Sequence, residues 1–219
     1  VLKGFKSLGY TTNHFVLNSA DFGVPQKRNR LFIVASLHGH EISKPTPLNS
    51  KHITVKEAIE DLPEIENGNK EDTIAYSKAP LSKFSNLMRG KTELCSNNLV
   101  TYNAPHILER YDHIPQGGNW ESIPKRLMEN YADSSRCHTG IYRRLKENEP
   151  SVVIGNYRKN MLVHPWKNRG LSVREAARLQ SIPDKFRFFG SIGYQQQQVG
   201  NLVPPLLAKA VFNQILSCT

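Results

Sequence analysis

The stretch GVPQKRNRLFIVA, at residues 23–35, constrains the fold of this chain more than any other. Its second half is a run of apolar, β-prone side chains that predicts a strand, preceded by three cations. Side chains alternate along an extended chain, so Gln26, Arg28 and Arg30 should share one face, with Lys27 solvated on the other. Two guanidinium groups about 7 Å apart suit a phosphate or a base edge. The same charges could instead protect an edge strand from aggregation, so this stretch alone leaves both interpretations open.

The charge balance favours a polyanionic partner. Lys and Arg number 29 against 19 acidic residues, which gives a net charge of +10. The excess is uneven, because residues 125–178 hold twelve cations and five acids, whereas residues 51–75 hold three and seven. A basic protein without a nucleic-acid role remains an alternative at this point. The 219 residues suffice for one large domain or two modest ones.

Cysteine usage and hydropathy exclude several other classes. Cys95, Cys137 and Cys218 are widely spaced and odd in number, which argues against a disulfide framework and a zinc site and indicates a reducing cytoplasm. No apolar run approaches the ~18 residues of a membrane span, and no signal peptide is visible. We therefore expect neither a metal site nor a membrane segment. The chain starts with Val1 instead of Met, which favours a piece of a longer protein.

Capping boxes mark two of the expected helices. Thr54 with Glu57, and Ser172 with Glu175, have the spacing in which the N-cap and the third helical residue bond each other's backbone. The expected elements are a helix end at 1–10, strands at 14–17, 31–35 and 152–155, and helices at 53–63, 171–181 and 203–216. The last helix has one apolar face and should dock on another element. That face comprises Leu206, Leu207, Ala210, Val211 and Ile215.

Three segments, read together, resemble the C-terminal motifs of the DNA (cytosine-5) methyltransferases. They are GVPQKRNRLFIVA, RGLSVREAARLQSIPDKF (169–186) and QVGNLVPPLLAKA (198–210), in the order and approximate spacing of that family. Close similarity covers residues 1–36 and 169–216. HIPQGGNW (113–120), a tight turn signal, is similar to a phrase in bacterial restriction-modification members. The weakly similar middle of the chain lies where the family has its variable target-recognition domain.

The resemblance assigns roles to the charged motif residues. In the family, the Gln-x-Arg-x-Arg arginines lie at the active site and contact an extruded cytosine, which implies this role for Arg28 and Arg30, with Gln26 alongside. The second motif is mainly structural in the family. This agrees with the residues themselves, which suit helix capping and ion pairing: Arg174, Glu175 and Arg178.

The third motif implies a cofactor. In the family, Gly-Asn-x-Val-x-Pro borders the S-adenosylmethionine pocket, and Gly200 and Asn201 match it. Leu202 departs from the pattern, because the family usually has Ser or Ala there, so only its backbone is available for a cofactor contact.

The fold that the resemblance implies is α/β. It comprises the last strands and the returning C-terminal helix of a Rossmann-like methyltransferase lobe, plus a mixed, loop-rich α+β target-recognition lobe. The expected boundaries are residues 1–36 for the strands, 37–195 for the recognition lobe with the RGLSVREAARLQ helix, and 196–219 for the returning helix.

The family's nucleophile is missing from this sequence. The family reaction needs a cysteine in a Pro-Cys dipeptide, which adds to C6 of a flipped cytosine before C5 attacks the methyl donor. No cysteine here follows a proline, and the family's Glu-Asn-Val and Phe-x-Gly-x-Gly motifs are also absent. We therefore expect the chain to be inactive alone. It would need an N-terminal catalytic part, in cis or as a separate subunit. We expect the protein to be cytoplasmic and to be encoded by a bacterium or a phage.

Double-stranded DNA is the expected partner. Candidate contacts, more of them to phosphates than to base edges, are Arg136, His138, Arg143, Arg144, Arg158 and Lys159. The alternatives are a stand-alone sequence-specific DNA-binding module, the recognition subunit of a split methyltransferase, and, on charge alone, an RNA-binding or structural protein. The terminal helix and the strand at 31–35 should expose apolar surface, through which a homodimer could form.

Overall fold

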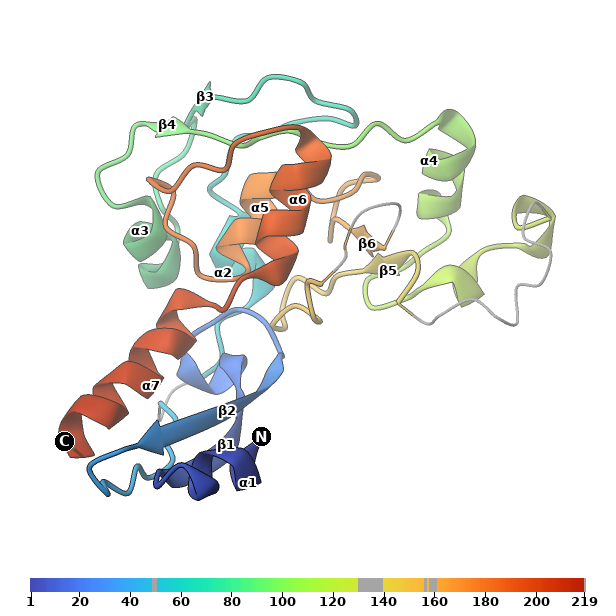
Figure 1. Cartoon of the computed structure of the whole chain (residues 1–219). Helices are drawn as coiled ribbons and strands as arrows, with labels where there is room; N and C mark the ends of the chain where they lie inside the picture. Colours follow the sequence, from blue (N-terminus) through green and yellow to red (C-terminus); the bar gives the residue numbers. More distant parts are fainter. Residues whose placement is uncertain (49–50, 130–139, 156, 158–160, 219) are drawn as a thin grey trace.

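The chain is a mixed α/β protein in which three small sheets lie among short helices and long connections (Figure 1). The computed structural model describes residues 1–48, 51–129, 140–155, 157 and 161–218. Its helices are α1 (Leu2–Ser7), α2 (Val55–Ile59), α3 (Lys83–Arg89), α4 (Pro105–Asp112), α5 (Val173–Arg178), α6 (Ile192–Asn201) and α7 (Pro205–Cys218). Its strands are β1 (Thr11–Asn18), β2 (Asn29–Ser36), β3 (Ile74–Ala75), β4 (Leu94–Cys95), β5 (Arg143–Arg144) and β6 (Leu162–Val163). Single-turn 3₁₀ helices span Ser19–Phe22, Trp120–Ser122 and Lys125–Leu127.

The N-terminal strands form an antiparallel hairpin, which confirms the predicted strands at 14–17 and 31–35. One face of the hairpin is apolar, and Phe15 stacks on Phe32 across the strands with ring centroids 6.2 Å apart. The opposite face is open to solvent, since Leu31 is 60% exposed. The turn between the strands is closed by Asn18, whose side chain accepts hydrogen bonds from the backbone N–H groups of Ala20 and Arg28.

Helix α7 packs on the apolar face of the hairpin, as its sequence predicts (Figure 1). Leu207 and Val211 are buried against Phe15 and Leu17, and the other three residues of the expected apolar face pack around them. Prolines at the start of α7 fit the first helical turn, where no backbone N–H is needed. The hairpin and α7 thus form one small packing unit.

The second, larger core surrounds α5, all of whose residues are buried. Both predicted capping boxes are present, Thr54 with Glu57 on α2 and Ser172 with Glu175 on α5. The arginines of α5 are fully buried and are neutralised there. Arg178 donates to Asp184 and to Asp61, with N–O distances of 2.6 and 2.9 Å.

Two features differ from the expectation. The predicted strand at 152–155 was wrong, because this part of the chain makes only one isolated bridge, between Ser151 and Gln26. Helix α6 was not predicted, since its polar run lacks an apolar repeat. Its buried glutamines are held by hydrogen bonds instead, Gln195 to Asn97 and Gln196 to Thr101.

Two kinds of feature are absent from the described residues. None of their helices is both long and apolar enough to cross a membrane. They also contain no group of three or more His, Cys, Asp or Glu side chains that could hold a metal ion.

We expect Arg178→Ala to lower the free energy of unfolding by about 3–5 kcal/mol, because it leaves the buried carboxylate of Asp61 without its cation and removes two hydrogen bonds from the buried carboxylate of Asp184. Lys78→Ala is the matched control, since it breaks an exposed ion pair to Glu64 and should cost less than about 1 kcal/mol. Urea unfolding followed by circular dichroism measures both. Equal losses in the two variants would show that the buried network does not stabilise this core.

Candidate functional site

The residues that begin β2 alternate as the sequence predicts. Gln26 and Arg28 are buried, Lys27 and Asn29 are exposed, and Arg30 is half-buried. The alternation is set by β2 pairing on one side and by the bridge from Gln26 to Ser151 on the other. Buried and exposed side chains therefore separate into two faces, one of which points into the molecule.

Arg28 joins three segments that are distant in the sequence. Its guanidinium donates to the carbonyl of Ile154 at 2.7 Å, to the side chain of Gln180 at 3.4 Å and to the carbonyl of Gly200 at 3.3 Å. Burial and, secondarily, the neighbouring charge of Arg30 lower the pKa of Arg28 to about 10. The guanidinium is thus charged at neutral pH, and both of its terminal nitrogens donate to protein acceptors, whereas its Nε has no partner among the described residues. These bonds give it the geometry of a positioning group.

Gln180 completes the junction of the three sequence motifs. Its side chain accepts from Arg28 and donates to the carbonyl of Val199, one residue before the Gly-Asn pair. Gly200 and Asn201 form the last turn of α6, where Asn201 is exposed and Leu202 is half-buried. The structure therefore brings the expected arginine and cofactor motifs together. Gln180 was not selected from the sequence, because a lone glutamine at the end of a helix carries no chemical signal.

Polar side-chain groups of Gln26, Arg28 and Arg30 at this junction lack hydrogen-bond partners among the described residues. The guanidinium of Arg30 makes one hydrogen bond to the described residues, to the backbone carbonyl of its neighbour Asn29 at 2.8 Å. Gln26 is fully buried, yet neither its carbonyl oxygen nor its amide nitrogen has a partner among the described residues. An unpaired buried amide is costly, so Gln26 is a candidate for a role beyond packing.

Arg144 was expected to contact DNA, and this expectation was wrong. Its guanidinium is buried and donates to the backbone carbonyls of Tyr111, Ile114, His164 and Lys167 and to the side chain of Asn168. A guanidinium has five N–H groups, so these bonds leave none for a phosphate. Arg144 is a structural residue that holds the segment around β5 and β6.

Of the other expected DNA contacts, the structure describes only Arg143. Arg143 is half-buried and lines a small cavity of about 60 Å³ with Gly117 and Lys146. Four expected contacts lie outside the described residues: Arg136, His138, Arg158 and Lys159.

Cys95 does not have the surroundings of a nucleophile. Cys95 is fully buried, its thiol donates to Asn98 at 3.3 Å, and burial raises its pKa to about 11. A thiol with so high a pKa is inert at neutral pH. Cys218 lies at the end of α7, after Ser217, and Cys137 lies outside the described residues.

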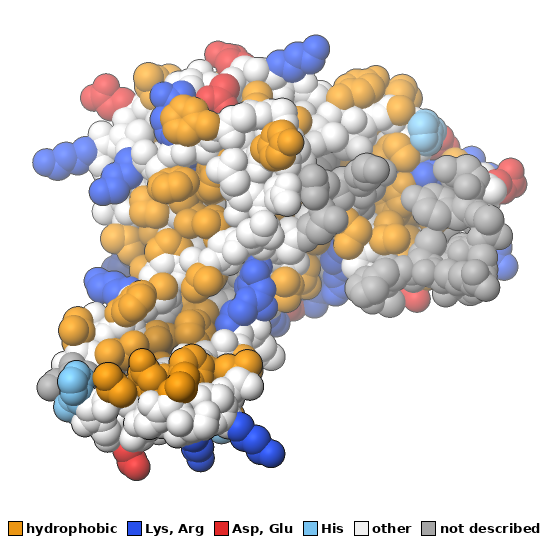
Figure 2. Space-filling view, in the orientation of Figure 1, with side chains coloured by type: hydrophobic (Ala, Val, Ile, Leu, Met, Phe, Trp, Pro, Cys, Tyr) orange, Lys and Arg blue, Asp and Glu red, His pale blue; other side chains and the backbone are white. Residues whose placement is uncertain are grey.

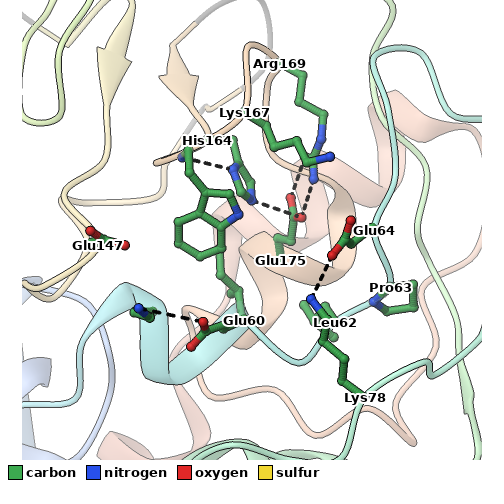
Figure 3. Close-up of a pocket in the computed structure, with 13 residues that line it drawn as sticks. Glu60, Leu62, Pro63, Glu64, Lys78, Glu147, His164, Lys167, Arg169 and Glu175 are labelled. Atoms are coloured by element: carbon green, nitrogen blue, oxygen red, sulfur yellow. Dashed lines mark hydrogen bonds and ion pairs between the residues drawn. The ribbon is translucent and has the colours of Figure 1, made fainter.

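A cavity of about 230 Å³ lies between α2, α5 and the segment around Trp166 (Figure 3). Its charged lining is balanced, four cations against four carboxylates, so it has no preference for a polyanion: Lys56, Lys78, Lys167, Arg169, Glu60, Glu64, Glu147 and Glu175. In its wall, His164 and Arg169 both contact Glu175, at 3.5 and 2.7 Å. Burial tends to raise the pKa of Glu175, but Arg169 and His164 outweigh it and hold that pKa well below its ordinary value.

We expect His164 to make stability depend on pH. Burial lowers its pKa below the ordinary value of 6.5, against an opposing effect of Glu175, so the folded state binds fewer protons than the unfolded one. The contribution of neutral, buried His164 to the free energy of unfolding is therefore complete above pH 6.5. It is lost as the pH falls from there toward the lowered pKa of His164 in the folded state. Urea midpoints measured across this range should fall less steeply for His164→Gln than for the unmodified chain. His106→Gln, at an exposed position on α4, is the control, and equal slopes in all three proteins would contradict this role of His164.

Comparison with known proteins gives the same family over nearly the whole chain. The family described as C-5 cytosine-specific DNA methylase matches residues 1–217. The type II methyltransferase M1.HphI of Haemophilus parahaemolyticus is 36% identical over 217 residues, which cover 99% of this chain and 50% of that protein. The type II methyltransferase M.DdeI of Desulfomicrobium norvegicum is 28% identical, over 98% of this chain and 56% of that protein.

A solved structure supports the fold. A protein described as a DNA modification methyltransferase encoded within a prophage (E. coli) superimposes with a TM-score of 0.76 at 23% identity. The match covers 99% of this chain and 64% of that one. The chain thus spans about half the length of the curated relatives named above.

Proposed function

Because the chain belongs to the family of C-5 cytosine-specific DNA methylases, we propose that it is the part of such an enzyme that reads the DNA target and supplies the active-site arginines. The parent enzyme would methylate C5 of a flipped cytosine within a specific duplex sequence. The observation that carries the proposal is the junction at Arg28, where hydrogen bonds join β2, Gln180 and Gly200. A chain used only for binding has little need for such a junction.

The two arginines have separate roles in this proposal. Arg30, which has one backbone hydrogen bond and is half-buried, holds the extruded cytosine. Arg28 holds the surroundings of Arg30 in place through its bonds to Ile154, Gln180 and Gly200. The nucleophile would come from a Pro-Cys segment that this sequence does not contain.

S-adenosylmethionine would supply the methyl group when bound. The residues present fit one wall of its pocket, since Asn201 exposes its carboxamide at the end of α6 and Arg28 fixes the adjoining carbonyl of Gly200. Leu202 would contribute its backbone only. The remaining walls would come from the N-terminal catalytic part, in cis or as a separate subunit.

The hairpin would dock on that catalytic part. In the described structure β2 pairs with β1 on one edge and with no strand on the other. The face away from α7 exposes Val16, Leu31 and Ile33, and Figure 2 shows hydrophobic side chains gathered over the region of β1, β2 and α7. In this proposal residues 1–36 and 196–219 belong to the catalytic lobe, and residues 37–195 form the recognition lobe.

We expect methyl transfer to appear when this chain is mixed with an N-terminal fragment that carries the Pro-Cys and Glu-Asn-Val segments. The readout is transfer of labelled methyl groups from S-adenosylmethionine to duplex DNA, and the same fragment with the cysteine changed to alanine is the control. A folded assembly without transfer would contradict the proposal. A homodimer of this chain, detected by sedimentation and unaffected by that fragment, would assign the exposed face to self-association.

Arg30→Ala should reduce kcat/KM of the assembled enzyme by about 10²-fold or more, because it removes one preorganised donor from the transition state. Its urea midpoint should stay close to that of the unmodified chain. Arg28→Ala should lower both activity and the urea midpoint, since it removes three hydrogen bonds. Loss of stability in Arg30→Ala with unchanged activity would reverse the two assignments.

A further inference from the structure

Lys27 takes part in a charged cluster that was not predicted from the sequence. Its ammonium pairs with one oxygen of Glu149 at 3.2 Å, and Lys146 pairs with the other oxygen at 2.6 Å. These three side chains, the Lys27–Glu149–Lys146 cluster, are each about half exposed. Hydrogen bonds from Lys146 and then from Lys27 lower the pKa of Glu149, so its carboxylate is charged at neutral pH.

The backbone fixes the cluster beside the start of β2. The N–H of Lys27 donates to the carbonyl of Ser151 at 2.8 Å, and the N–H of Ser151 donates to the carbonyl of Pro25 at 2.9 Å. Lys27 therefore comes from the hairpin, whereas Lys146 and Glu149 come from the segment after β5. A ligand held by both lysines would lie across the joint of these two parts, one residue from Arg28.

The HIPQGGNW turn orients the second lysine. Gly117 has φ = +79°, a conformation that favours glycine, and a Cβ atom there would lie 2.5 Å from Cε of Lys146. The methylene chain of Lys146 thus lies directly on the backbone of this glycine. Arg143 lines the same small cavity, and no hydrogen bond or ion pair links its side chain to the described residues. Two lysines thus contact one carboxylate, and Arg143 lines the cavity beside it.

We propose that this cluster, together with Arg143, binds a backbone phosphate of duplex DNA, and that Glu149 is a counter-ion which the phosphate displaces. The inference rests on the proposed DNA-binding role and names one of its contacts. A carboxylate between two lysines occupies the place of a phosphate, and exposed ion pairs contribute so little free energy that the exchange costs little. Release of counter-ions from DNA favours it further.

Removing a lysine of the cluster and neutralising its glutamate should change the affinity for DNA in opposite directions. Binding of a fluorescent 20-base-pair duplex is measured by anisotropy over a range of salt concentrations. Lys27→Ala and Lys146→Ala should each weaken binding, and the slope of log affinity against log salt should become shallower by about 0.9 for each phosphate that the variant no longer neutralises. Glu149→Gln should strengthen binding several-fold, because the phosphate no longer competes with a carboxylate.

The control is another exposed ion pair with the same charges. Lys78 and Glu64 pair at 2.7 Å in the cavity of Figure 3. Lys78→Ala and Glu64→Gln should change affinity far less than the cluster variants do. Equal effects at the two places, or weaker binding by Glu149→Gln, would overturn the inference while DNA binding itself stands. Absence of duplex binding by the unmodified chain would instead overturn both the proposed DNA-binding role and this contact.

Discussion

Arg178 donates hydrogen bonds to Asp61 and Asp184, and so joins α2 to the turn after α5 through charges that water does not reach. Comparable bonds recur at Arg28, Arg144 and Arg174, whose guanidinium groups are buried and reach acceptors on distant segments. The three sheets have two strands each, so strand pairing connects few parts of the chain. Buried guanidinium groups connect the distant segments instead, because each one can donate hydrogen bonds to several loop carbonyls at once.

The linking of distant segments by buried arginines explains which features could be predicted from the sequence. The hairpin strands, both capping boxes and the apolar face of α7 depend on neighbours a few residues away, and all were confirmed. The alternation from Gln26 to Arg30 is equally local. The burial of Arg144 and the contacts of Gln180 depend on segments far along the chain, so no spacing rule could identify them. Helix α6 was missed for a related reason, since its buried face is made of glutamines whose partners come from elsewhere.

Burial changes the interpretation of the cations in residues 125–178. The segment 125–178 was selected for its twelve cations, but four of them are buried: Arg144, Arg169, Arg174 and Arg178. Composition therefore overstates how much of this segment can face a nucleic acid. The described cations of this segment that are not buried are Lys125, Arg126, Arg143, Lys146 and Lys167. Of these, Lys146 pairs with Glu149, which Lys27 at the start of β2 also contacts.

Arg28 connects the hairpin to two distant segments mainly through backbone carbonyls, those of Ile154 and Gly200. A hydrogen bond to a carbonyl depends on the path of the chain and not on which side chain the residue carries. Residue 154 can therefore vary without loss of this bond, provided that the backbone keeps its course. In the proposed enzyme, a scaffold attached in this way can change its side chains from one target sequence to another while the arginines keep their positions, so specificity can evolve separately from the chemistry.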